Sequence, residues 1–352
     1  MWELRRYHIV FKICFDCCNP GLKVERKIGM AEEKNETPMT DESEEEEEEG
    51  GPGVQMIEPP EPEPVALDPN AYDVDLTHKR VTNLNGFEVL RQVETLCLRQ
   101  NEIRKIENFE NLTTLTDLDL YDNQLKKIEG LQTLVNMRIL DLSFNKIRTI
   151  ENLETLVKIE RIFLINNKIS KIENISHFTN LNMLELGDNR IRKLENLDAL
   201  VNLESLFVGK NKITKLENLE KLTKLRVLSI QSNRITKLEG LETLTNLEEL
   251  YISHNGLEVM ENLENNAKLT TLDLAGNKIT RIQKIGHLVQ LEEFWFNNNL
   301  LNHWKDVDQL TPLSNLQTVY LEHNPIYKDK MYRNKVKLAV PHLKQIDATY
   351  CR

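Results

Sequence analysis

The sequence contains few cysteines, few aromatic residues and no long apolar run. Its 352 residues include five cysteines, and aromatic side chains make up 6% of the chain. The absence of any 18-residue apolar stretch excludes a protein built from membrane-spanning helices. The sparse cysteines likewise exclude a scaffold that disulfide bonds hold together.

Proline and charge are distributed unevenly along the chain. Eight of the 11 prolines precede residue 70, and none lies between Asn70 and Thr311. Residues 31–75 contain 17 acidic residues and one basic residue, whereas residues 76–352 contain 36 acidic and 38 basic residues. The net charge of −11 therefore arises near the N-terminus, and the rest of the chain lacks the basic surface expected of a nucleic-acid-binding protein.

The N-terminal part of the chain is expected to form no folded domain. Residues 30–73 are predicted to be a disordered acidic and proline-rich tail, because they have too little apolar surface to offset the entropy lost on ordering. Ser43 precedes the unbroken run Glu44–Glu49 and is a candidate site for an acid-directed kinase. Residues 1–29 are interpreted as a non-native or alternative N-terminal extension, because Met30 is a credible alternative start of translation.

Residues 74–324 repeat with a period of 22. Each unit contains two apolar residues, most often leucines, in the pattern of Leu-x-Leu-x-x-Asn at 96–101, and an isoleucine or leucine follows the asparagine two residues later. The asparagine of this phrase recurs at Asn101, Asn123, Asn145, Asn167, Asn189, Asn211, Asn233, Asn255, Asn277 and Asn299, and once more after 25 residues at Asn324. An N-terminal half-repeat followed by eleven such units is typical of a leucine-rich-repeat protein with short repeats.

This period predicts a leucine-rich-repeat solenoid with a curved parallel sheet on its concave face. Alternate leucines of each short strand point inward, and the asparagine amide bonds backbone groups that would otherwise be buried unpaired. Because 22 residues leave no room for a return helix, the convex segments should be short 3₁₀ or irregular turns. At the far corner Gly and Asn alternate, apart from Lys284, which indicates a backbone position with positive φ. Residues 325–352 should form a C-terminal cap, with a helix over 328–339.

One side chain in each unit, between the two leucines, should face outward on the concave side. These residues are Asp75, Cys97, Asp119, Asp141, Phe163, Glu185, Phe207, Ser229, Tyr251, Asp273, Trp295 and Tyr320. Aromatic residues supply five of them, and exposed aromatics among acids are typical of the centre of a protein interface. Strands spaced by about 4.8 Å make this column roughly 50 Å long, which suits a protein partner better than a small molecule.

An enzymatic role is the alternative for the same surface. Asp119 and Asp141 are neighbours in the column, and carboxylates about 5 Å apart could act as an acid–base pair. A shallow sheet, however, is expected to leave both carboxylates solvated and their pKa values unshifted. Cys97 has no histidine near it in the repeat pattern. We therefore expect no enzyme, no cofactor and no metal site.

The repeats resemble those of the leucine-rich-repeat regulatory subunits of protein phosphatase 1. The resemblance rests on Leu-Cys-Leu-Arg-Gln-Asn at 96–101, Glu-Glu-Phe-Trp-Phe-Asn at 292–297 and Gln-Ile-Asp-Ala-Thr-Tyr at 345–350. It implies a non-catalytic subunit that is a monomer on its own, located in the nucleus and cytoplasm. Its concave face would bind the catalytic subunit of the phosphatase and control its activity or location. A third, inhibitor subunit could also bind to the complex. Neither nucleic acid nor a membrane would take part.

The resemblance also implies which residues contact the partner. Their counterparts here are Asp141, Phe163, Glu185, Phe207, Asp273, Glu293, Trp295 and Tyr320, to which we add Tyr251 as the remaining aromatic of the column. The aromatic residues would serve as apolar anchors, and the acidic residues would pair with basic groups of the phosphatase. The alternative interpretation is a general leucine-rich-repeat scaffold or assembly protein of the spliceosomal or axonemal type.

Overall fold

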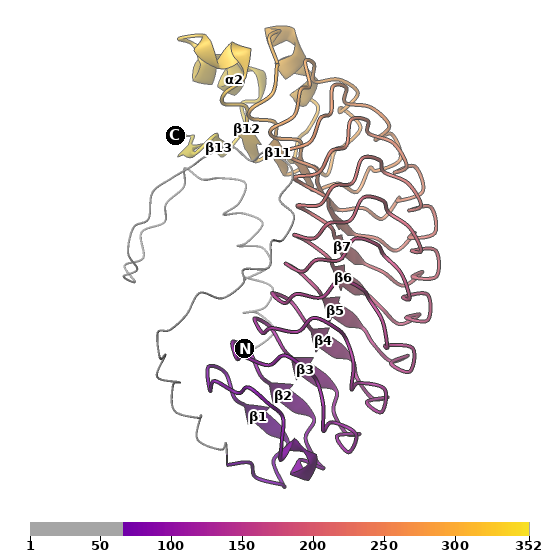
Figure 1. Ribbon diagram of the computed structural model, residues 1–352. Coiled ribbons are helices and arrows are strands. Elements are labelled where there is room, and N and C mark those ends of the chain that lie inside the picture. Colours follow the sequence, from indigo (N-terminus) through magenta and orange to yellow (C-terminus); the bar gives the residue numbers. More distant parts are fainter. Residues whose placement is uncertain (1–65, 352) are drawn as a thin grey trace, which may run out of the picture. The chain divides into compact units, whose positions relative to one another are not determined.

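The computed structural model describes residues 66–351, which stack as a series of similar turns (Figure 1). Residues 1–29, Ser43 and most of the predicted acidic tail lie outside these described residues. Within 66–351, no helix is both long enough and apolar enough to span a bilayer.

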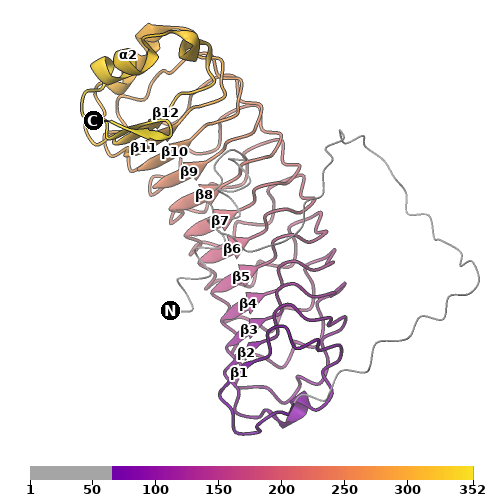
Figure 2. The same ribbon diagram turned by 90° about the vertical axis from the view of Figure 1, so that its left-hand side faces the viewer.

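One sheet of 14 strands runs through the described residues in chain order. Neighbouring strands are parallel, except that the last two form an antiparallel hairpin. The strands are β1 (Asp73–Asp75), β2 (Thr95–Cys97), β3 (Asp117–Asp119), β4 (Ile139–Asp141), β5 (Arg161–Phe163), β6 (Met183–Glu185), β7 (Ser205–Phe207), β8 (Val227–Ser229), β9 (Glu249–Tyr251), β10 (Thr271–Asp273), β11 (Glu293–Trp295), β12 (Thr318–Tyr320), β13 (Gln345–Ile346) and β14 (Thr349–Tyr350). The parallel-sheet solenoid predicted from the 22-residue period is confirmed (Figure 2).

The core of the solenoid is a stack of leucine and isoleucine side chains. The middle residue of each strand points inward, so Leu118, Leu140 and Leu206 have no exposed surface. Between successive strands the chain returns through irregular turns, as the length of the repeat predicts. Truncating one of these core leucines to alanine should cost about 2–5 kcal/mol of stability.

Each asparagine of the repeat phrase satisfies backbone groups of two successive turns. The Asn145 Nδ2 donates to the carbonyl oxygens of Leu120 and Leu142, both at 3.0 Å. Its Oδ1 accepts from the Leu125 N–H at 2.9 Å. The same pattern recurs at Asn167, Asn189 and Asn211, so these side chains form a continuous ladder through the solenoid.

Two positions in each turn have a left-handed backbone. The far corner is one of them, as predicted, with φ of 59° at Asn152 and 52° at Lys284. The other, here called the turn position, is the residue that precedes each ladder asparagine, and it was not predicted. Its φ is positive at Gln100, Asp122, Phe144, Asn166, Asp188, Lys210, Ser232, His254, Gly276, Asn298 and His323. The chain therefore leaves every strand through a conformation that favours Gly, Asn and Asp.

Additional elements cover the two ends of the solenoid. At the N-terminal end the 3₁₀ helix η1 (Phe87–Val89) buries Phe87, whose ring lies 6.2 Å from that of Phe109. At the C-terminal end the elements are η2 (Trp304–Leu310), η3 (Pro325–Lys328), α2 (Tyr332–Ala339) and the β13–β14 hairpin.

The helix predicted over 328–339 is shorter in the structure. Asp329 has an extended backbone that separates η3 from α2, and its side chain accepts from the Met331 N–H at 2.8 Å. The helix therefore begins at Tyr332 rather than at residue 328. After it, Asp347 directly follows β13, and its carboxylate accepts from the Leu321 and Glu322 N–H groups at 2.8 and 3.0 Å.

Candidate functional site

The third residues of the strands lie side by side and form one column along the sheet, here called the concave column. The pairing register places Asp141 beside Phe163, Phe163 beside Glu185, and Glu185 beside Phe207. Further along, Tyr251, Asp273, Trp295 and Tyr320 follow one another on β9 to β12. Glu293, the first residue of β11, points to the same face as Trp295. All nine side chains predicted to bind a partner therefore lie on one face.

The exposure predicted for this column is wrong for several of its members. Phe163 is 6% exposed, Asp141 5% and Glu185 2%, and the other four aromatic residues of the column are half-buried. Side chains on strands about 4.8 Å apart cover one another, and the residue two positions after each strand contributes to the same face. The concave face is therefore a packed layer of side chains, in which part of each aromatic ring remains accessible.

Near β11 and β12, hydrogen bonds and stacking hold the aromatic side chains in place. The rings of Trp295 and Tyr320 stack with centroids 4.8 Å apart. The Trp295 Nε1 donates to the Glu293 carboxylate at 3.2 Å, and the Tyr251 hydroxyl donates to the Glu249 carboxylate at 2.8 Å. Because these rings are already ordered, a partner that binds them would lose less conformational entropy in doing so.

Glu185 is a buried carboxyl group at the centre of the column. Its Oε1 accepts from the Gly187 N–H at 2.7 Å. The pKa of Glu185 is raised to about 8, chiefly by burial and to a smaller extent by the nearby Asp141 carboxylate, against the opposing effect of the Gly187 N–H. At neutral pH this side chain is therefore largely protonated, and a cationic group placed against it would favour loss of the proton.

Asp273 is a second buried carboxyl group, between Tyr251 and Trp295 in the column. The pKa of Asp273 is raised to about 6 by burial, against the opposing effect of hydrogen bonds from the Ser253 hydroxyl and the Ala275 N–H. Because this value lies below neutral pH, Asp273 supplies negative charge beside the aromatic residues under ordinary conditions.

The adjacent carboxylates of Asp119 and Asp141 are not solvated, contrary to the prediction. Asp119 has no exposed surface, and the Arg99 Nη1 lies 2.9 Å from its Oδ2 and 3.7 Å from the Oδ2 of Asp141. The Arg99 guanidinium also lies 3.9 Å above the ring of Tyr121. Arg99 and Tyr121 were not predicted at this site, although strand alternation, continued two residues past Cys97 and Asp119, places both on this face.

The concave side is strongly acidic over its first six strands. The strand residues and the three residues after each strand carry eight carboxyl groups, of which Glu185 is largely protonated at neutral pH, and two guanidinium groups. The acidic residues are Asp73, Asp75, Asp117, Asp119, Asp122, Asp141, Glu185 and Asp188, and the basic residues are Arg99 and Arg161. This imbalance favours a partner surface with basic groups.

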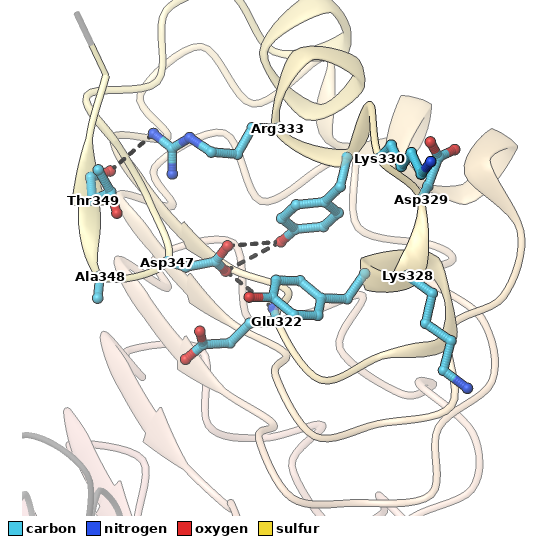
Figure 3. Close-up of a pocket in the computed structure, with 10 residues that line it drawn as sticks. Glu322, Lys328, Asp329, Lys330, Arg333, Asp347, Ala348 and Thr349 are labelled. Carbon is cyan, nitrogen blue, oxygen red and sulfur yellow. Dashed lines mark hydrogen bonds between the residues drawn. The ribbon is translucent and has the colours of Figure 1, made fainter.

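The described residues also contain a pocket of about 470 Å³ in the C-terminal cap (Figure 3). The Asp347 carboxylate in this pocket accepts from the Tyr332 hydroxyl at 3.0 and 3.1 Å. Arg333 donates to the carbonyl oxygens of Ile346 and Thr349. These polar groups tie the β13–β14 hairpin to α2, so the structure gives them a role in the cap itself.

Neither a reactive thiol nor a metal-binding cluster is found among the described residues of the concave face. Burial raises the pKa of the Cys97 thiol to about 11, so it is protonated and a poor nucleophile at neutral pH. Within 66–351, no three His, Cys, Asp or Glu side chains form a cluster that could hold a metal ion.

Comparison with known families shows leucine-rich repeats along most of the described part of the chain. A family model described as "Leucine-rich repeat" matches residues 166–253 and 242–351, which together make up more than half of the sequence. A second model, "Leucine Rich repeats (2 copies)", matches residues 91–133.

Curated relatives are similar to a short part of the chain. Protein phosphatase 1 regulatory subunit 7 of Xenopus tropicalis is 58% identical over 53 residues, which is 15% of this chain and 15% of that protein. Its Homo sapiens counterpart is 56% identical over 49 residues, or 14% of each chain. Protein phosphatase 1 regulatory subunit SDS22 of Schizosaccharomyces pombe is 54% identical over 44 residues, 12% of this chain and 13% of that protein. The matches thus span about a seventh of each relative.

Solved structures resemble this chain over a much greater length. An internalin of Listeria monocytogenes, inlF, is 25% identical with a TM-score of 0.66, and covers 80% of this chain and 87% of its own. The functional domain of InlJ from the same organism is also 25% identical, with a TM-score of 0.62. The match covers 75% of this chain and 55% of the InlJ chain. These likenesses concern the architecture of the repeats.

Proposed function

Because the chain belongs to the leucine-rich-repeat family, we propose that it is a non-catalytic regulatory subunit that binds the catalytic subunit of protein phosphatase 1 on its concave face. The observation that carries the proposal is the in-register column of aromatic and acidic side chains, which ends in the stacked pair Trp295 and Tyr320. The names of the curated relatives support the choice of partner.

In this proposal the half-buried aromatic residues are the apolar anchors. Phe207, Tyr251, Trp295 and Tyr320 each keep part of a ring accessible, whereas Phe163 is mostly covered by its neighbours. Large aromatic side chains in partly formed pockets supply much of the binding energy of protein interfaces. Truncation of Trp295 to alanine should therefore cost about 2–4 kcal/mol of binding.

Three of the four acidic residues divide into two groups, and the fourth, Asp141, already lies 3.7 Å from the Arg99 guanidinium. Asp273 and Glu293 lie beside the stacked aromatic pair and would meet basic groups of the phosphatase directly. Glu185 would pair with a basic group only after losing its proton, because burial raises its pKa to about 8. Binding through Glu185 would therefore release a proton at neutral pH.

Calorimetric titration of the full chain into the phosphatase catalytic subunit tests the proposal. Trp295→Ala should abolish most of the binding, whereas Tyr350→Ala, which removes an aromatic ring that is 76% exposed on the cap, should leave it unchanged. The catalytic subunit should be tested both with and without its metal ions, to determine which form is bound. If neither form binds the wild-type chain, the phosphatase proposal is wrong and a general scaffold becomes the better hypothesis.

A further inference from the structure

Phe144 is the exception among the residues at the turn position. It has φ of 56°, and the other turn positions are occupied by polar residues or glycine. A bulky aromatic residue in the left-handed region is a genuine outlier, because only Gly, Asn and Asp adopt it readily. Backbone strain of this kind is found preferentially at functional sites. The repeat architecture therefore gives no reason for an aromatic side chain at this position.

The side chain of Phe144 does not contribute to the core of the solenoid. It is half-buried, and its ring lies 4.8 Å from the ring of Tyr121, which is half-buried as well. Neither residue belongs to the continuous apolar core of the repeats. The Arg99 guanidinium also lies 3.9 Å from the centre of the Tyr121 ring. The two rings and the guanidinium thus form an ordered aromatic patch at the margin of the concave face.

Negative charge lies on both sides of this patch. The turn position before Phe144 is Asp122, which is exposed, and the one after it is Asn166. The Asn166 Nδ2 donates to the Asp188 carboxylate at 3.1 Å, so a second carboxylate lies two turns further along. A partner that covers the aromatic rings would therefore be favoured by basic side chains around its apolar contact.

We propose that Tyr121 and Phe144 form a second contact patch for a protein surface in which an apolar side chain lies beside a lysine or arginine. The patch is continuous with the concave column, because Phe144 follows Asp141 of β4 by three residues. The inference rests on the proposed function, because it takes the same phosphatase catalytic subunit as the partner. The proposed contacts then lie in two places, at the stacked pair on β11 and β12 and at the turns that follow β3 and β4.

The test compares the affinity of three variants of the full chain for the catalytic subunit. Phe144→Asn places at this position the residue found at Asn166 and Asn298, which suits a left-handed backbone, and should weaken binding about ten-fold. Ser232→Asn introduces the same residue at a turn position four repeats away and should bind like the wild type. Trp295→Ala tests the proposed function independently.

Each outcome separates the two proposals. If Phe144→Asn binds like the wild type while Trp295→Ala fails to bind, the second patch is wrong and the proposed function stands. If the wild-type chain does not bind at all, both are wrong. Thermal unfolding is measured in parallel, because a lower midpoint for Phe144→Asn than for Ser232→Asn would show that Phe144 serves packing, and would also overturn the patch.

The charge of the patch is tested with Asp122→Asn. This exposed carboxylate should accelerate association with a basic surface, so its loss should slow association at low ionic strength. The difference from the wild type should disappear at about 0.5 M salt, where the Debye length is a few ångströms. An association rate unchanged at low salt would contradict a basic partner surface at this patch.

Discussion

Trp295 and Tyr320 stack with their ring centroids 4.8 Å apart and an interplanar angle of 29°, although 25 residues separate them in the sequence. The pair exists because β11 and β12 are adjacent parallel strands whose third residues are in register. Each ring therefore limits the rotamers of the other, and the Glu293 carboxylate fixes the indole N–H.

This stacking predicts that the two residues act together in binding. Tyr320→Ala should weaken binding by more than the loss of its own contacts, because the indole of Trp295 becomes less ordered. A double-mutant cycle with Trp295→Ala should give a coupling energy of about 1 kcal/mol. Additive effects would show that the two rings bind independently.

Glu185 predicts a pH dependence of stability. Its ordinary pKa near 4.5 applies to the unfolded chain, and burial raises the pKa to about 8 in the folded state. Between these values the folded state holds a proton that the unfolded state has released, so this group's contribution to stability falls as pH rises from about 4.5 to 8. Glu185→Gln should abolish the loss and be more stable than the wild type at pH 8, by on the order of 2–5 kcal/mol.

Urea unfolding of wild type and Glu185→Gln at several pH values between 5 and 8 measures this difference. Glu110→Gln, in which an exposed carboxyl group is replaced, is the matched control and should follow the wild-type pH profile. Parallel profiles for wild type and Glu185→Gln would mean that Glu185 is ionised in the folded state.

Arg99 should be important for stability because it compensates a buried charge. Arg99→Met leaves the Asp119 carboxylate, which has no exposed surface, without its cation, and should destabilise the fold by about 3–5 kcal/mol. The double variant Arg99→Met, Asp119→Asn should recover much of the loss. Arg138→Met is the control, because the Arg138–Glu160 pair is largely exposed and contributes about 0–1 kcal/mol. Similar losses for both arginine variants would contradict this account.

The asparagine ladder predicts a difference between buried and exposed asparagines. Asn211→Ala leaves the Ile191 N–H buried without its partner and removes one of the two amide donors to the Leu186 carbonyl oxygen, the other being Asn189, and should cost about 1–3 kcal/mol. Asn136→Ala removes an exposed hydrogen bond to the Thr113 carbonyl oxygen and should cost less than about 1 kcal/mol. Chemical denaturation of the two variants decides whether burial accounts for the difference.

The repeat period was sufficient to predict which residues share a face, because a strict 22-residue spacing fixes the register of every strand. It could not predict burial. The exposure of Phe163 depends on the side chains of Asp141 and Glu185 beside it, and a pattern derived from one repeat contains no information about its neighbours. The carboxyl groups of the column were expected to be solvated because the pattern does not show which neighbouring side chains cover them. Glu185 is in fact buried.

Two parts of the concave side were missed for different reasons. Arg99 and Tyr121 lie two residues past the ends of their strands, and the predicted column included only the residue between the two apolar positions of each repeat. Phe144 could not be placed from alternation at all, because the positive φ of the turn position redirects its side chain. The β13–β14 hairpin was also unforeseen, since its strands comprise two residues each and lie outside the period.

The regular register of the strands also makes distance along the concave face a matter of counting repeats. Each additional turn moves a side chain by roughly 4.8 Å, so the separation between Phe144 and Trp295 is set by the number of units between them. Deleting one complete 22-residue unit would preserve the leucine core and every kind of side chain, yet bring the two contact regions one strand closer. A rigid partner that touches both regions would then no longer fit, which makes repeat number itself a determinant of specificity.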